Sequence, residues 1–279
     1  MKTTVTILCD NYVGKTRLIA EHGLCVMIER GNEKYLWDTS PGISLPHNLE
    51  VLGKNLKGLK GIVLSHGHYD HTGGLKYAVQ ESGGVEVVAH RAVFSKHMAL
   101  NRKDPGEAPH YVGCPYSQQE LEELGAAFHF VKHTKVICSG IWFLTEIDRI
   151  AAQLPTDSHL VIPKGNKFVP DPVEDDASLL LEIDGPPILL LGCAHAGILN
   201  ILDHVKDKMG IYKLGAVLGG THLMFSGTYS IQAVMDRLEE FCVDLIGVSH
   251  CTGFKAAAEL AHHFGNRFVI GSAGSVFTF

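Results

Sequence analysis

The segment HGHYDH, from His66 to His71, constrains this chain more than any other, because it places three imidazoles and one carboxylate directly after the apolar run 62–64. A buried strand that ends here would fix its own backbone and direct the next side chains into a cleft. His and Asp are ligands that borderline and hard divalent ions prefer. Alternate side chains of an extended backbone point the same way, so we expect His66 and His68 to bind one ion. Asp70 and His71 would then face a second ion.

Three later histidines occupy comparable positions. His195, His222 and His250 each follow an apolar run, at 188–191, 216–218 and 245–248. A single histidine after a strand is more often structural than a ligand. Three of them together with the 66–71 cluster favour convergence at one edge of a sheet, so we expect His195 and His250 to be ligands. His222 stays open between a ligand, a catalytic acid and a structural residue.

Charge and cysteine content limit the partners and the compartment. The net charge is −6 and there is no basic stripe, which argues against nucleic-acid binding. No apolar run approaches the length of a membrane span, so no membrane association is expected. The seven cysteines are odd in number and widely spaced, which is not typical of a disulfide framework. These features predict a cytoplasmic protein with a small-molecule substrate, and they leave the oligomeric state open.

The order of elements predicts an α/β chain (α+β in some schemes) with buried strands covered by helices. No linker divides it, so we expect a single domain over 1–279 built of two similar halves. The expected strands are 5–8, 24–28, 34–37, 59–64, 85–89, 178–183, 188–191, 216–218 and 245–248. The expected helices are 74–80, 92–100, one that begins at a capping box of Ser117 and Glu120, 197–208, 231–241 and 256–264, with a long loop over 101–116.

With these residues in view, the chain resembles the metallo-β-lactamase superfamily over nearly its whole length. The resemblance rests on Asp38 after an early strand, the 66–71 cluster, His195 and His250, in the family's order. It implies a four-layer αββα sandwich with two metals at one edge between the sheets. It further implies two ligand sets, which are His66, His68 and His195 for one ion, and Asp70, His71 and His250 for the other. Asp38 would support the site from behind the ligands.

One departure from the family's pattern concerns the ligand between the two metals. Many members carry a bridging aspartate where this chain has His222, in the segment 219–223. A histidine cannot bridge two cations as a carboxylate does. Asp176 could compensate, but a charged run before a strand is more typical of a solvated turn. Cys193 and Cys251, beside predicted ligands, are interpreted as small packed residues.

A narrower resemblance links the chain to the dihydropterin–ribofuranosylaminobenzene phosphate synthase-like group. It rests on the segments EHG at 21–23, GCAHAG at 192–197, GGTH at 219–222 and HCTG at 250–253. His22 would either face the cleft or simply begin a strand. The remaining histidines, including His97 and His159, have no convergent neighbours in the sequence and are interpreted as structural.

Three functions are compatible with these patterns. The first is a binuclear hydrolase in which a metal-bound hydroxide attacks a small ester or phosphorylated substrate. Asp70 would orient the hydroxide, and His222 would donate a proton unless it is a ligand. The expected cofactors are two divalent ions, zinc first, with manganese, iron or magnesium as alternatives. The second function is a metal-dependent transferase that joins a ribofuranosylaminobenzene phosphate to a dihydropterin diphosphate. The third is a ligand-binding or regulatory protein that keeps the metals without turnover.

Overall fold

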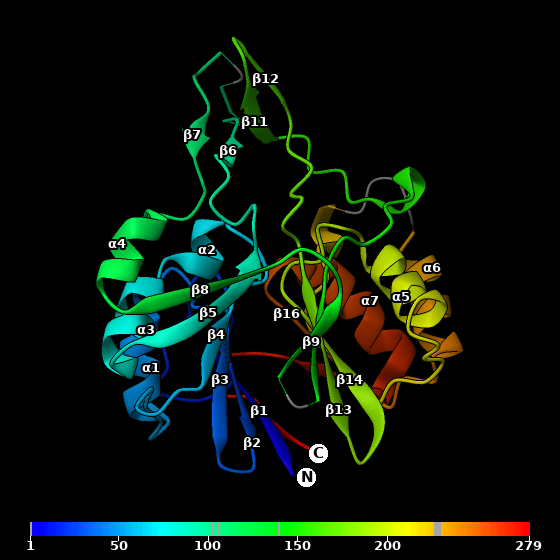
Figure 1. Cartoon of the computed structure of the whole chain (residues 1–279). Helices are drawn as coiled ribbons and strands as arrows, with labels where there is room; N and C mark the ends of the chain where they lie inside the picture. The colour runs from blue at the N-terminus through cyan, green and yellow to red at the C-terminus, as the bar shows by residue number, and fades with distance from the viewer. Residues whose placement is uncertain (1, 102, 105, 139, 226–229) are drawn as a thin grey trace.

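Two large mixed sheets form the centre of the protein (Figure 1). The computed structural model describes residues 2–101, 103–104, 106–138, 140–225 and 230–279. Within these residues the first sheet has seven strands, in the order β18 (Val276–Thr278), β1 (Thr3–Cys9), β2 (Cys25–Arg30), β3 (Glu33–Trp37), β4 (Gly61–Val63), β5 (Val85–His90) and β8 (Ala126–Val131). Strands β3, β4, β5 and β8 run parallel to one another.

The second sheet also has seven strands among the described residues. Their order is β17 (Phe268–Ile270), β16 (Leu245–Ser249), β15 (Ala216–Gly220), β14 (Gly185–Leu191), β13 (Ser178–Ile183), β10 (Ile141–Leu144) and β9 (Lys135–Cys138). Strands β14 to β17 are parallel. The carboxyl ends of parallel strands meet at one edge of a sheet, which is where open α/β sheets bind their ligands.

Helices cover the outer face of each sheet. The first sheet is covered by α1 (Ser44–Val51), α2 (Tyr69–Thr72), α3 (Leu75–Ser82) and α4 (Gln118–Glu123). The second is covered by α5 (Ile198–Asp207), α6 (Ile231–Glu240) and α7 (Phe254–Phe264). Short 3₁₀ turns complete the chain, namely η1 (Ala151–Gln153), η2 (Leu223–Phe225), η3 (His250–Thr252) and η4 (Gly265–Arg267). The expected αββα sandwich is confirmed.

Alternating burial explains why the central strands are apolar throughout. In β13, Leu179 and Leu181 pack between the two sheets, whereas Leu180 packs under the helices of the second sheet. A separate core joins the first sheet to its own helices, with Leu36 and Ile62 among its members. Strands covered on both faces need apolar residues at consecutive positions, as the sequence shows.

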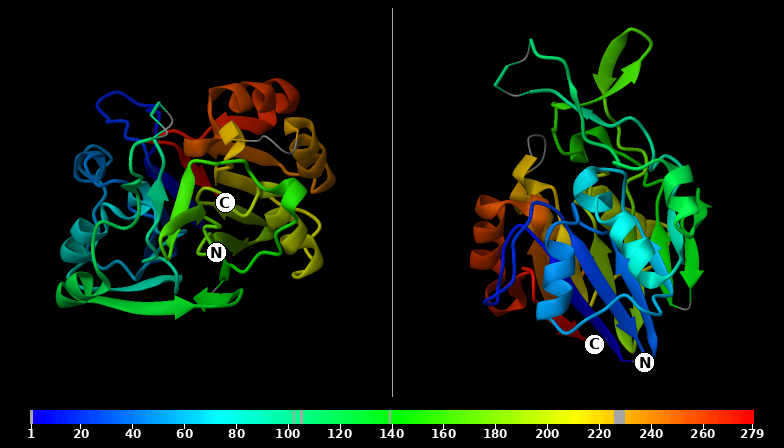
Figure 2. Two further views of the ribbon diagram at one scale, coloured as in Figure 1. Left: turned by 90° about the horizontal axis from the view of Figure 1, so that it is seen from above. Right: turned by 90° about the vertical axis from the view of Figure 1, so that its left-hand side faces the viewer.

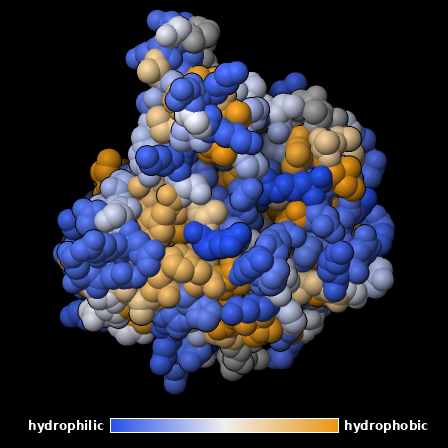
Figure 3. Space-filling model, turned by 45° about the horizontal axis from the view of Figure 1, so that its top comes forward, coloured by the Kyte–Doolittle hydropathy of each residue, from blue (hydrophilic) through white to orange (hydrophobic). Residues whose placement is uncertain are grey.

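A third, four-stranded sheet projects from the edge where the parallel strands end (Figures 1 and 2). Its order is β12 (Lys167–Pro170), β11 (Leu160–Lys164), β6 (Met98–Ala99) and β7 (His110–Tyr111), and we call it the cap. Its tip is mostly hydrophilic (Figure 3). Residues 102 and 105 of the predicted loop 101–116 lie outside the described residues.

The helix predicted over 92–100 is wrong. The segment forms turns and then β6, which pairs with β11. His97 Nδ1 lies 2.6 Å from Asp171 Oδ2, and both side chains are buried. This long-range pair outweighs the local helical tendency, as tertiary contacts often do. The other predicted helices are confirmed to within a few residues, including the capping box at Ser117 and Glu120. No helix in the described part of the chain is long and apolar enough to span a membrane.

Candidate metal centre

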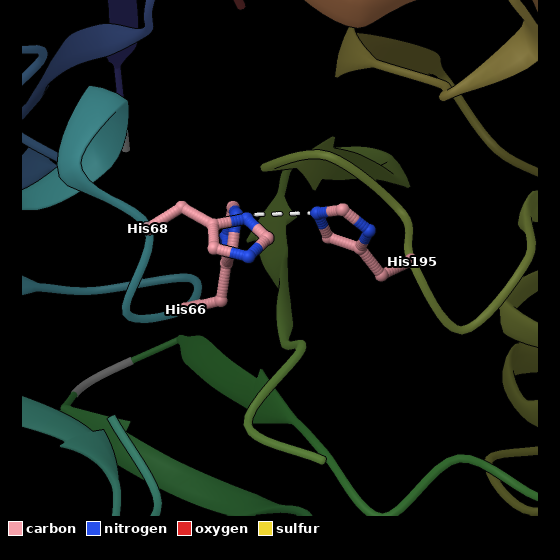
Figure 4. A group of neighbouring side chains, drawn as sticks. All are labelled: His66, His68 and His195. Atoms are coloured by element: carbon pink, nitrogen blue, oxygen red, sulfur yellow. Dashed lines mark hydrogen bonds between the residues drawn. The ribbon is translucent and has the colours of Figure 1, made fainter. Parts of the chain in front are cut away.

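Three histidines converge from the two sheets at the edge beneath the cap (Figure 4). His66 and His68 follow β4, and His195 follows β14 of the opposite sheet. His66 Nε2 and His195 Nε2 lie 3.3 Å apart, and one ring nitrogen from each of the three lies within 4.8 Å of the others. We call these residues the first ligand group. All three are buried.

A second ligand group lies beside the first and consists of Asp70, His71 and His250. His71 Nε2 is 3.2 Å from His250 Nε2, and Asp70 Oδ2 is 3.4 Å from the same nitrogen of His250. His22 Nε2 lies 3.5 Å from Asp70 Oδ2, so His22 faces the cleft rather than only beginning a strand. The fold thus brings together the six residues expected to bind metal.

Close backbone approach makes the 66–71 turn possible. A Cβ atom built on Gly67 would lie 2.0 Å from the carbonyl oxygen of Val93, so this position accepts only glycine without a shift of the backbone. The Gly67 N–H donates to Asp175 Oδ2 at 2.6 Å. His97 was predicted to be structural and without convergent neighbours. Its Nε2 lies 3.6 Å from the same carboxylate oxygen, and its ring packs edge-on against His68.

Buried polar residues orient the ligands from behind. Asp38 Oδ2 lies 2.7 Å from His71 Nδ1 and accepts a hydrogen bond from Ser65 Oγ at 2.7 Å. Ser65 Oγ also lies 2.8 Å from His66 Nδ1. Asn11 Oδ1 is 2.9 Å from His250 Nδ1. The three contacts with a histidine engage Nδ1 and leave Nε2 free to bind an ion, as is typical of metal-binding histidines.

Four residues that follow strands near the site have an unusual backbone conformation. Asp38, Ala194, His222 and His250 all have positive φ, between 50° and 59°. Residues other than glycine rarely adopt this conformation, and such residues cluster where function fixes the geometry. His222 and His250, which have this conformation, both line the cavity at the site.

The distances between ligand nitrogens fit the coordination of divalent ions. Two nitrogens bound to one tetrahedral zinc, each about 2.0–2.1 Å from it, lie roughly 3.3 Å apart. The nitrogen pair in each ligand group has this separation, 3.3 Å in the first and 3.2 Å in the second. His68 Nε2 is buried and has no hydrogen-bond partner among the described residues. A buried nitrogen without a partner is costly unless a ligand satisfies it.

The two groups differ in their electrostatics. Burial lowers the pKa of His68 to about 4 and holds the pKa values of His66 and His195 well below the usual range. Burial also disfavours protonation of His71, but Asp38 and Asp70 outweigh it and raise the pKa of His71 to about 9. The first group therefore presents neutral imidazoles, whereas the second contains the carboxylate of Asp70 and lies beside that of Asp38.

His222 lies at the margin of the first group. Its ring centroid is 4.3 Å from that of His195, and its Nε2 is 3.4 Å from Asp157 Oδ2. Burial disfavours the charged form, yet the contact with Asp157 helps raise the pKa of His222 to about 9. Asp157 could not be predicted from the sequence as a partner of His222, because it lies 65 positions away, on the approach to the cap.

Asp176 does not replace the missing bridging carboxylate. Its Oδ2 accepts the backbone N–H of Ala196 at 2.9 Å and so fixes the loop that carries His195. Burial raises the pKa of Asp176 to about 6. The solvated turn expected at this position is wrong, because the side chain is buried.

A cavity of about 320 Å³ opens over the two groups. Its floor includes Asp70, His195 and His250, and its roof comes from the cap through residues such as His110 and Leu160. A larger hollow of about 890 Å³ lies against α5 and the outer face of the second sheet, away from both ligand groups. The smaller cavity is lined by predicted metal ligands, so we take it as the candidate substrate site.

Comparison with known proteins agrees with this geometry. Two proteins of Methanocaldococcus jannaschii match 98% of this chain. One is the uncharacterized protein MJ0448, 31% identical over 277 residues and matched over 98% of its length. The other is 7,8-dihydropterin-6-methyl-4-(beta-D-ribofuranosyl)-aminobenzene-5'-phosphate synthase, 28% identical over 286 residues and matched over 95% of its length.

Solved structures share the fold. Tm1679, a metal-dependent hydrolase of the beta-lactamase superfamily, superposes with a TM-score of 0.82 at 24% identity, covering 99% of this chain and 98% of that one. Zn²⁺-bound PqqB from Methylobacterium extorquens has a TM-score of 0.58 at 11% identity, covering 98% and 99% of the two chains. The profile of the metallo-beta-lactamase superfamily matches residues 18–230. The chain therefore belongs to the metallo-β-lactamase superfamily.

Proposed function

We propose that this protein is a binuclear metal-dependent hydrolase that acts on a small ester or phosphorylated substrate in the cavity beneath the cap. One observation carries the proposal. Each ligand group holds a pair of ring nitrogens at the separation expected for ligands of one ion, 3.3 Å and 3.2 Å. Histidine with a single carboxylate suits zinc, and it also permits manganese or iron.

The ions, when bound, would lower the pKa of a shared water toward roughly 7 and stabilise charge on the reacting oxygens. Asp70 lines the cavity and keeps its pKa below the usual range, because His71 and His250 outweigh the effect of burial. A carboxylate that stays ionised there can accept a hydrogen bond from the attacking water and orient it. Neutral imidazoles of the first group keep their lone pairs available for a cation.

His222 is suited to donate a proton to the leaving group. Asp157 engages its Nε2, and its Nδ1 is buried with no partner in the described part of the chain. A pKa of about 9 keeps this imidazole protonated at neutral pH. A charged donor of this kind contributes most when the leaving group is a poor one.

The cavity limits the size of the substrate. A volume of about 320 Å³ is at the lower end of small-molecule sites. The Phe225 ring centroid lies 4.7 Å from that of His222 and 5.9 Å from that of His159, which gives the wall an aromatic surface of tilted rings. Imidazoles beside such a surface favour a compact substrate with a ring and an anionic group.

The test is a screen of purified, zinc-loaded protein against phosphodiesters, thioesters, lactones and pterin diphosphates. Hydrolysis in ¹⁸O-labelled water should place the label in the product. Absence of turnover with every class, in protein that binds two ions, would contradict the proposal and favour a binding or regulatory role.

The relative of M. jannaschii that is named a synthase supports a second candidate, a transferase that joins an aromatic amine to a dihydropterin diphosphate. In that reaction the metals would stabilise the diphosphate that leaves. The two functions separate in one assay with a pterin diphosphate. Diphosphate released only in the presence of the amine acceptor would replace hydrolysis by transfer.

A further inference from the structure

The thiol of Cys193 lies between the two ligand groups. Cys193 Sγ is 3.2 Å from His71 Nε2, and the side chain is buried. Sγ also lies within 4.8 Å of a ligand nitrogen of His66 on one side and of His250 on the other. It is the shared member of three clusters of potential ligands, which contain His66 with His71, His195 with His222, and His250 with Cys251.

Three carboxylates near the centre contact residues other than Cys193. Asp70 faces His250 and His22 on the outer side of the second group. Asp176 binds the backbone of Ala196, and Asp157 contacts His222. We therefore consider Cys193 Sγ as the ligand atom for the position between the two groups. A neutral imidazole offers one lone pair to one ion, whereas a thiolate keeps further lone pairs and can contact two.

The backbone holds Cys193 in this place. Ala194 has a φ of 58°, and the next residues are anchored by the hydrogen bond from Ala196 N to Asp176. The turn directs both Cys193 and His195 at the centre. The second cysteine nearby, Cys251, is less available, because its sulfur accepts the N–H of His222 at 3.3 Å and lies 3.4 Å from the carbonyl oxygen of Cys193.

We propose that Cys193 is a metal ligand whose thiolate bridges the two ions, in the role that an aspartate has in many relatives. This inference rests on the proposed binuclear centre. Binding transfers the thiol proton to solvent and involves no change of oxidation state. A thiolate ligand also makes the site softer, so it selects zinc or iron over magnesium and manganese.

Cobalt(II) reports the sulfur directly. We expect the full-length protein loaded with two equivalents of Co²⁺ to show a thiolate-to-cobalt charge-transfer band in the near ultraviolet. Cys193→Ser should lose the band. Cys251→Ser should retain it, as should Cys242→Ser, a control at an exposed cysteine. A band that persists in Cys193→Ser, or that disappears in Cys251→Ser alone, would overturn the assignment.

Two further measurements cover a variant that fails to fold or to bind cobalt. X-ray absorption of the unaltered zinc protein should show a Zn–S distance of about 2.3 Å, and a shell of nitrogen and oxygen alone would contradict the inference. Cys193→Asp should recover binding of two ions without the charge-transfer band, because a carboxylate also bridges. If the unaltered protein bound no metal at all, the proposed function would fail. Two ions bound without sulfur would overturn the role of Cys193 alone.

Discussion

The two ligand groups are built from similar residues and yet differ in charge. The first consists of three buried imidazoles, whose pKa values burial holds low. The second includes Asp70, and Asp38 lies 2.7 Å behind its His71. A carboxylate behind a histidine raises the basicity of that ligand, and a carboxylate ligand adds charge. We infer that the attraction between charges contributes more to binding of an ion in the second group. The fixed positions of neutral imidazoles contribute more to binding of an ion in the first.

This difference shows that residues close together in the sequence need not belong to the same ligand group. His66 and His71 are five positions apart but belong to different groups, because α2 begins between them and turns the chain. Each group is completed only by a residue from the second sheet, His195 or His250. The following predictions test whether the groups are distinct in the way that we describe.

The largest effect is expected from His195→Ala. Removing this ligand should reduce the metal content from two ions to one and lower hydrolysis on the order of 10³-fold or more, because ligands of one centre act as a unit. Elemental analysis after gel filtration measures the content. His204→Ala is the matched control, since His204 is a buried histidine on α5, outside both groups. Two ions retained in His195→Ala would remove it from the first group.

Next in size is His222→Gln, which tests a proton donor at the margin of the first group. We expect turnover to fall by about 10²–10⁴-fold for a substrate with a poor leaving group, and much less for an activated ester. The metal content should stay at two. Asp157→Asn should show the same dependence on the leaving group, more weakly. A loss of one ion in His222→Gln would instead identify His222 as a ligand.

A smaller effect should follow from Asp38→Asn, which weakens the support behind His71. The affinity for one of the two ions should fall by about 10–100-fold. Competition with a chromophoric chelator resolves the two binding steps. Ser65→Ala removes a hydroxyl that contacts both His66 Nδ1 and Asp38, so it should weaken both steps, and each by less. Equal weakening of both steps in Asp38→Asn would contradict separate groups.

The smallest effect concerns stability and pH. In metal-free protein the pKa of Asp176 is about 6, raised by burial above its unfolded value near 3.8. A carboxyl group with a raised pKa stabilises the fold below the unfolded value and loses that contribution as the pH rises through the folded one. Between pH 4 and 6 the unaltered protein should lose about 2 kcal/mol of unfolding free energy relative to Asp176→Asn. Urea unfolding at several pH values measures this, and parallel pH profiles of the two proteins would disprove it.

Much of the fold could be predicted, because its signals are local. Apolar runs marked half of the strands in the described part of the chain, β1 to β5 and β13 to β16, and the capping box marked the start of α4. The failure at 92–100 has a specific cause, since the pair of His97 and Asp171 joins residues 74 positions apart. No periodicity within the segment records such a partner.

The sequence by itself determined the 66–71 cluster, because a strand and its turn convert a spacing of a few residues directly into geometry. The order of Asp38, this cluster, His195 and His250 along the chain carried the resemblance to the superfamily, and that resemblance implied the αββα layers. The tertiary structure alone decided that Cys193 lies between the two groups, that Asp157 contacts His222, and that Asp176 supports a loop. The sulfur of Cys193 meets His71 across 122 positions of the chain. Contacts of this kind arise only when two sheets pack face to face and bring the carboxyl ends of their strands to one edge.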